Sequence, residues 1–309
     1  MRSLIQWFDS QGAADASSLQ ARQASQDTSS IDWFRVLPFL LMHLACFSVV
    51  WVGWSPIAVA VAVALYGIRM FAITAFYHRY FSHRTFKTSR SVQFVFALIG
   101  ASATQRGPLW WASHHRQHHR SADQEGDPHT PHNGFWWSHM GWFLSKAHFH
   151  ADYSRVKDWE KYPELRWIDR FDIAVPVALA MGLFLLGSAL EYFAPQLNTS
   201  GGQMLVWGYF ISTVVLTHAT LTINSLAHRW GKQRFNTGDD SRNNGLLALI
   251  TLGEGWHNNH HYYPASARQG FYWWELDISY YLIRLMGALG LVWDIKPVPK
   301  QRLKQGEQR

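Results

Sequence analysis

Four long apolar runs constrain the fold of this chain more than any other feature. They cover approximately residues 36–52, 57–76, 173–194 and 204–223, and they contain few charged side chains, among them Arg69 and Glu191. Each run is close to the ~20 residues that a helix needs to cross a bilayer. Four buried helices of a soluble bundle are the alternative, but runs this long and this poor in charge favour membrane spans. We therefore expect an all-α membrane protein with four transmembrane helices arranged as two hairpins.

The distribution of lysine and arginine predicts how these spans are oriented. The connectors at residues 52–57 and 192–203 contain neither residue type, whereas segments 79–170 and 229–309 are rich in both. Because positive charge marks the cytoplasmic side of membrane proteins, we expect both termini and both basic segments to face the cytoplasm. The stretches at about 77–172 and 224–295 would then form a helical cytoplasmic cap. The formal net charge of +7 fits a surface near anionic lipid better than nucleic acid binding, for which the sequence shows no recognisable module.

The remaining segments complete the expected domain organisation. Residues 1–34 are polar and rich in Gln, Ser and Ala, and we expect a disordered tail; residues 35–295 would form the membrane domain, and residues 296–309 a basic C-terminal tail. The apolar segment 92–103 is too short to cross a bilayer, and segment 276–293 looks amphipathic. The single cysteine, Cys46, argues against an internal disulfide, a zinc ribbon or a cysteine-ligated iron–sulfur cluster.

Histidine is concentrated in four short motifs, each next to a predicted span or in a cytoplasmic segment. HRYFSH, HRQHH, NSLAH and WHNNHH hold nine of the 17 histidines. Residues at i, i+3 and i+4 of a helix share a face, so HRQHH and WHNNHH each gather three imidazoles, and Asn224 shares a face with the histidine of NSLAH. The two histidines of HRYFSH are five residues apart and must approach from different sides or straddle a helix end. The nine are His78, His83, His115, His118, His119, His228, His257, His260 and His261.

A metal site explains this clustering better than ordinary hydrogen bonding does. Nine imidazoles packed without metal would leave buried polar atoms unpaired, and partial protonation would make them repel one another. Imidazole binds iron, copper, zinc and nickel, so ligand type does not choose the ion, but nine nitrogens suggest two ions rather than one. Spacing alone leaves open whether His114 belongs to the set. Ordinary hydrogen-bonding roles are expected for His43, His139, His148, His150 and His218.

The motifs resemble the histidine boxes of the membrane fatty acid desaturases, in particular the Δ9 branch similar to stearoyl-CoA desaturase. The resemblance runs from about Val36 to Trp293 and includes ITAFYHRYFSHRTFK, GDPHTPHNGFWWSHMGWFL and SRNNGLLALITLGEGWHNNHHYYP. It implies a non-haem di-iron centre held by the nine histidines, with Asn224 holding a water on one iron. The H-x-x-H-H pattern of the family matches His115, His118 and His119, which leaves His114 behind the site or on the surface.

The resemblance also implies a reaction and its partners. The enzyme would remove two vicinal hydrogens from a saturated acyl chain and leave a cis double bond, at Δ9 in the branch that it resembles. An unactivated C–H bond needs an oxidant made from O2 at the irons, so we expect no separate acid or base residue. The chain has no haem module, dinucleotide fingerprint or cysteine cluster, so electrons would come from an external donor such as cytochrome b5 or a ferredoxin, docked on the basic face.

The acyl carrier is where the sequence departs from the family pattern. Animal acyl-CoA desaturases read W-A-R-D-H-R-x-H-H where this chain has WASHHRQHH, and D-P-H-N-S-R-R-G-F where it has DPHTPHNGF. The missing arginines would remove bidentate phosphate contacts, so an acyl-lipid fits as well as an acyl-CoA, although Lys146 keeps one basic position. The tryptophans beside the ligand motifs would line an acyl tunnel or anchor the protein at the membrane interface; they are Trp110, Trp111, Trp142 and Trp256.

Two other functions fit parts of the pattern. A hydroxylase or other oxygenase of the same histidine-box superfamily would share the metal centre and differ in its product. A membrane metal carrier or sensor would place histidines along a path through the bilayer, whereas all four motifs here fall on the predicted cytoplasmic side.

Overall fold

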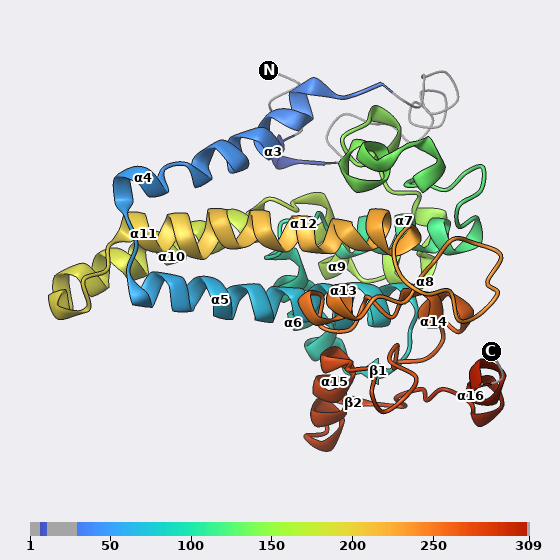
Figure 1. The fold of residues 1–309 in the computed structure, drawn as a ribbon. Helices are drawn as coiled ribbons and strands as arrows, with labels where there is room; N and C mark the ends of the chain where they lie inside the picture. The colour runs from blue at the N-terminus through green and yellow to red at the C-terminus, as the bar shows by residue number, and fades with distance from the viewer. Residues whose placement is uncertain (1–6, 11–29, 308–309) are drawn as a thin grey trace.

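The computed structural model describes residues 7–10 and 30–307, and these parts are mostly helical (Figure 1). Three helices are long and apolar enough to cross a membrane: Pro56–Ser82, Ala174–Phe193 and Gly201–His228. They correspond to the predicted spans 57–76, 173–194 and 204–223. In Figure 1 they form one elongated layer, with α5 (Pro56–Phe71) beside the element that runs from α11 (Gly201–Leu205) to α12 (Ser212–Ser225), and α10 (Ala174–Phe193) behind.

The predicted span at residues 36–52 differs from the other three. It is divided between α3 (Trp33–Cys46), which contains Pro38, and α4 (Val49–Val52). The apolar part, Val36–Val52, counts among the shorter apolar helices, and its 17 residues would extend about 26 Å, less than the ~30 Å of a hydrocarbon core. The fourth span and the pairing of the spans into two hairpins therefore stay predictions.

Two of the long helices contain π-helical turns, in which a backbone N–H bonds to the carbonyl five residues earlier. η1 (Ala72–Ser82) continues α5 for eleven residues, all buried, and η7 (Val206–Ile211) joins α11 to α12. Just beyond η1, His83 N donates to His78 O at 3.2 Å. The two histidines of the first motif therefore straddle the end of one helix, which is the second of the two arrangements expected from their spacing.

The other segments gather at one end of the long layer. α6 (Arg90–Ala101) has twelve residues, and it does not separate the first two histidine motifs, because the rings of His78 and His115 lie 4.4 Å apart. α7 (Pro108–Arg120) begins where the Oδ1 of Asp169 accepts from the first two N–H groups after Pro108 at 2.9 and 2.8 Å, as an N-terminal cap does. The further helical elements here are η2 (Pro131–Asn133), η3 (Trp137–Gly141), η4 (Lys146–His148), η5 (Tyr153–Arg155), α8 (Lys157–Glu160), α9 (Pro163–Arg170), η8 (Leu226–His228), α13 (Gly245–Ile250) and α14 (His257–Tyr262).

The C-terminal segment returns to the first histidine motif. β1 (Lys87–Thr88) pairs antiparallel with β2 (Val292–Trp293), next to α15 (Ile278–Ala288). Arg79, only 1% exposed, donates to Asp277 at 3.0 Å and to Glu254 at 3.0 Å. A buried cation that is paired twice links η1 to both later segments and fixes the backbone that carries His78.

The predicted tails are only partly within the described residues. Residues 1–6 and 11–29 of the predicted tail 1–34 lie outside them, whereas Trp7–Ser10 lie against α9, where Asp9 pairs with Arg170 at 2.6 Å. Within the predicted tail 296–309, Lys300–Glu307 form α16. Between α10 and α11, Pro195–Leu197 form the short helix η6. The domain boundaries stay predictions.

Candidate metal centre and adjoining cavity

The structure brings the nine predicted histidines into two adjacent groups. In the first group, one ring nitrogen from each of five histidines lies within 4.8 Å of the others, and the same holds for four histidines in the second. The first group comes from η1 and its end, α7 and α14; the second comes from α7, η8 and α14. They are His78, His83, His115, His119 and His260 in the first group, and His118, His228, His257 and His261 in the second.

Neighbouring residues on two helices divide between the groups. On α7, His118 points to the second group and His119 to the first; on α14, His260 belongs to the first and His261 to the second. The rings of His119 and His261 lie only 4.5 Å apart, so the two groups share a boundary. The histidines of α7 and those of α14 therefore do lie toward a common region, as predicted. On each helix, however, they divide between two groups instead of joining one.

The ring nitrogens are spaced as ligands of a transition metal would be. The closest Nε2–Nε2 pairs are His83–His115 at 2.8 Å and His119–His260 at 2.9 Å in the first group, and His228–His257 at 3.0 Å in the second. Imidazole nitrogens bind such metals at about 2.1 Å, so two nitrogens at right angles around one ion would be about 3.0 Å apart. The nitrogen atoms present thus fit one ion in each group.

Buried carboxylates contact the Nδ1 atoms of four of these rings, on the opposite side of each ring from the clustered Nε2 atoms. Asp127 accepts from His118 Nδ1 at 3.0 Å, Asp123 from His228 Nδ1 at 2.9 Å, and Asp239 from His261 Nδ1 at 2.8 Å, while Glu254 pairs with His78 Nδ1. All four carboxylates have side chains that are at most 7% exposed. A carboxylate at Nδ1 orients the ring and leaves Nε2 free as a ligand, which is the usual arrangement behind metal-bound histidine.

Sequence reasoning missed these four carboxylates. Their signal was present, because Asp123 and Asp127 follow HRQHH within nine residues and Glu254 precedes WHNNHH by two. It could not be read without the fold, since Asp123 serves His228, 105 residues further along the chain.

Burial keeps most of the cluster histidines neutral. Burial and then the neighbouring imidazoles hold the pKa values of six histidines well below their ordinary range. A neutral imidazole has a lone pair to offer, whereas a protonated one has none. The six are His83, His115, His119, His257, His260 and His261.

One more histidine, which the sequence did not single out, adjoins the second group. His129 lies with His118 and Asp127 in a third set of closely spaced possible ligands, and its ring is 4.2 Å from that of His118. Burial lowers the pKa of His129 to about 3. His114 belongs to neither histidine group; it is buried, its Nδ1 lies 3.0 Å from Trp110 O, and it faces the cavity described next.

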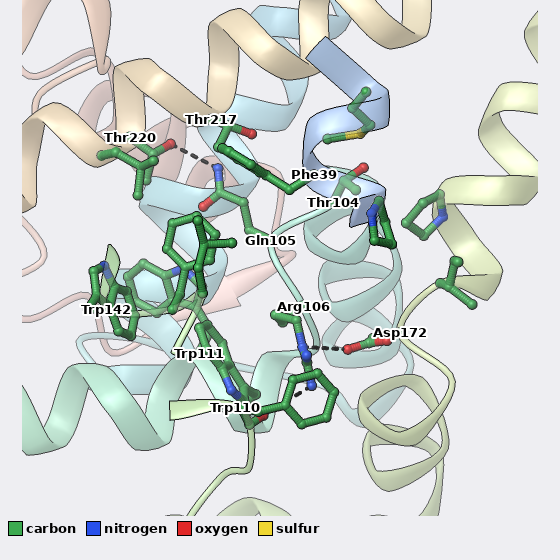
Figure 2. Close-up of a pocket in the computed structure, with 18 of the residues that line it drawn as sticks. Phe39, Thr104, Gln105, Arg106, Trp110, Trp111, Trp142, Asp172, Thr217 and Thr220 are labelled. Carbon is green, nitrogen blue, oxygen red and sulfur yellow. Dashed lines mark hydrogen bonds and ion pairs between the residues drawn. The ribbon is translucent and has the colours of Figure 1, made fainter. Parts of the chain in front are cut away.

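A cavity of about 640 Å³, lined mainly by apolar side chains, runs from the first histidine group between the long helices. His115 and Asn224 form part of its wall, so the cavity reaches the candidate metal centre. Figure 2 shows Trp110, Trp111 and Trp142 along it, and the hydrogen bond of 3.0 Å from Gln105 Nε2 to Thr220 Oγ1 that crosses one side. At another side, Arg106 pairs with Asp172 at 2.7 Å (Figure 2).

The predicted substrate contacts fall in different places. Trp142 lines the cavity, as do Trp110 and Trp111. Lys146 is exposed at the start of η4 and is not among the cavity-lining residues, and Trp256 donates to Leu276 O at 2.8 Å outside the cavity wall. The roles of Lys146, Trp142 and Trp256 in substrate binding stay predictions.

Comparison with known proteins gives consistent results. The family model described as "fatty acid desaturase" matches residues 53–292. A palmitoyl-monogalactosyldiacylglycerol delta-7 desaturase of Arabidopsis thaliana is 38% identical over 285 residues, which cover 91% of this chain and 72% of that protein. An sn-1 stearoyl-lipid 9-desaturase of Anabaena variabilis is 36% identical over 90% of this chain and 99% of its own length, and an acyl-CoA 5-desaturase of Anemone leveillei is 36% identical over 88% and 82%.

Proposed function

Because the chain belongs to the fatty acid desaturase family, whose members are oxidoreductases, we propose that it inserts a cis double bond at Δ9 of a saturated acyl chain. The reaction would use O2 and external electrons at a di-iron centre. The observation that carries this proposal is a largely apolar cavity beside two adjacent imidazole groups, with His115 of the first group and Asn224 in its wall.

In this proposal, the nine histidines hold two iron ions, five around one ion and four around the other, and Asn224 holds a water on one of them. The iron pair supplies the O2-derived oxidising power that an unactivated C–H bond requires. The carboxylates at His78, His118, His228 and His261 keep each ring oriented. The cavity excludes water and holds neighbouring methylenes beside the clusters, so that placement rather than acid–base chemistry selects the bond.

The substrate is proposed as an acyl-CoA or an acyl group esterified in a membrane lipid. Relatives carry both kinds of name, and the named positions include 5, 7 and 9. The position Δ9 follows the relatives named as 9-desaturases, two of which match 90% or more of this chain.

Electrons are proposed to enter from a second cavity, whose wall shares no residue with that of the first. This second cavity has a volume of about 600 Å³ and reaches His83 of the first group. Its wall includes four cations, three of them highly exposed: Arg84, Lys87, Arg90 and Lys296. An acidic donor such as cytochrome b5 or a ferredoxin would be attracted to this rim, although three of the cations already have acidic neighbours.

The protein is proposed to be a multi-pass membrane protein whose site and termini face the cytoplasm. Three helices have the length and composition that this requires. Both of the long helices that supply ligands do so at their C-terminal ends, at His78 and His228. The predicted orientation rests on the basic segments that follow these ends.

Expression in a desaturase-deficient host, with mass spectrometry of the lipids, tests the function. A new double bond in the host's acyl chains is expected, and its position and lipid class would identify the substrate. An alcohol in place of the alkene would show a hydroxylase. Unmodified acyl chains, together with exchangeable metal and no oxygen consumption by the purified protein, would indicate a metal carrier or sensor instead.

A further inference from the structure

Arg69 lies inside the first long helix and has no part in the histidine site described above. It is 0% exposed, among the largest fully buried side chains of the described residues. An ionised side chain within an apolar helix of this kind is costly and commonly marks a functional position. No carboxylate pairs with Arg69 in the described part of the chain, so the reason for its presence must lie in its other contacts.

The guanidinium group joins three segments that are far apart in the sequence. Its Nε donates to Leu65 O of its own helix at 3.1 Å, and Nη1 donates to Ser102 O at the end of α6 at 3.3 Å. Nη1 also donates to Thr213 Oγ1 at 2.7 Å, and Nη2 donates to Ser212 Oγ at the junction of η7 and α12. The hydroxyl proton of Ser212 goes to Gly208 O at 2.6 Å, so its oxygen is free to accept from Arg69.

Two of these segments continue directly into the wall of the acyl cavity. The chain after Ser102 supplies Thr104, Gln105 and Arg106, and η7 supplies Tyr209. Thr104 and Arg106 have positive φ values of 60° and 70°, which cost energy in residues other than glycine and persist only where the surroundings hold them. Tyr209 and Thr104 meet across the cavity with their hydroxyl oxygens 3.4 Å apart.

We propose that Arg69 is a positioning residue that sets the distance between the Thr104 and Tyr209 sides of the cavity, and thereby determines which pair of acyl carbons lies beside the histidine clusters. This inference rests on the proposed function. A planar fork with five donors makes all four of these bonds at once, whereas lysine has three donors on one nitrogen and glutamine has two. Without it, the strained connector 102–106 is released to relax, and an acyl chain can shift by one methylene.

The test compares Arg69→Gln and Thr213→Val with the matched control Thr222→Val. Thr222 lies on the same helix as Thr213, and its hydroxyl donates to Ala219 O at 2.6 Å rather than contacting Arg69. Each purified protein is assayed for iron content, for hydrogen exchange of residues 102–106, and for the positions of the double bonds it makes. Because one methylene in an apolar site changes selectivity by roughly 10–200-fold, we expect the share of products modified at a neighbouring carbon to rise about tenfold in Arg69→Gln.

The expected outcome is faster exchange of residues 102–106 and a shifted product distribution at unchanged iron content, with a smaller shift in Thr213→Val and none in Thr222→Val. A folded, iron-loaded Arg69→Gln protein with wild-type exchange and wild-type products would overturn the inference. Should Arg69→Gln fail to accumulate, wild-type behaviour of both Thr213→Val and Ser212→Ala would overturn it equally. A wild-type protein that modifies no acyl chain would refute the proposed function, while the exchange of residues 102–106 would still decide whether Arg69 holds that connector.

Discussion

Replacement of Asp239 by asparagine tests whether the carboxylates behind the histidine groups hold the ligands in place. Asp239 Oδ2 accepts from His261 Nδ1 at 2.8 Å, and both side chains are buried. The other oxygen, Oδ1, accepts from Ser241 N at 3.0 Å and from Thr237 Oγ1 at 2.7 Å. Because a backbone N–H can only donate, the oxygen of the new asparagine must stay at Oδ1, and its NH2 group then faces His261 Nδ1.

In this variant the amide NH2 group and His261 Nδ1–H are both donors and cannot bond to each other, so one of two unfavourable changes must follow. His261 can move its proton to Nε2, which removes the lone pair aimed at the second group, or the amide can flip and leave Ser241 N–H unpaired. An unpaired buried N–H costs about 1–3 kcal/mol, a factor of about 5–150. Loss of the partner behind a metal-bound histidine typically weakens metal binding about 10–100-fold. We therefore expect Asp239→Asn to bind one of the two proposed iron ions about 10–100-fold more weakly.

The assay is a chelator titration of purified protein, with iron counted per chain. Asp239→Asn should lose half of its iron at a chelator concentration about 10–100-fold below that needed for the wild type. Asp240→Asn is the control, because Asp240 is the next residue but pairs with His132 at the surface, outside both groups. Equal chelator sensitivity of Asp239→Asn and wild type would show that His261 is not oriented through Asp239, or is not a ligand.

Three further predictions concern the same region. His115→Gln should lose iron while His114→Gln keeps both ions, because only His115 lies within a group; equal iron contents in the two variants would contradict the assignment. Asp169→Asn should lower the free energy of unfolding by about 1–2 kcal/mol, measured by thermal or denaturant unfolding, because the carboxylate caps the first N–H groups of α7 and accepts from Tyr153. The melting temperature of the iron-free protein should fall as the pH drops below about 6.5, because the unfolded chain takes up protons there. In the folded chain the six cluster histidines with lowered pKa values stay neutral, and a melting temperature that is flat from pH 7 to pH 5 would refute this.

The convergence of the nine histidines was predictable from the sequence, but their division into two groups was not. Helical spacing correctly places the histidines of HRQHH and of WHNNHH on common faces, and all nine converge. Spacing could not show that His118 and His119 serve different groups, because that depends on where α14 and η8 pack against α7. It also could not show how His78 and His83 come together, since their approach depends on a π-helical turn that an α-helical pattern does not contain.

The long helices were predictable because composition alone identifies them, and three of the four expected runs are helices of sufficient length. The run at 36–52 is also helical but is divided after Cys46. The carboxylates and the cavity were not predictable in the same way. Both arise from loops and helix ends that are close only in space, as the 60 residues between Leu109 and its cap Asp169 illustrate.

The π-helical turn at the end of η1 has a consequence for protein design. In a regular α-helix, successive residues turn about 100°, so two positions five residues apart point about 140° away from each other. The bond from His83 N to His78 O brings this pair to a ring separation of 5.0 Å instead. A designer who transplants H-x4-H into an idealised α-helical scaffold would obtain two rings that cannot share an ion, and the backbone register would have to be transplanted together with the histidines.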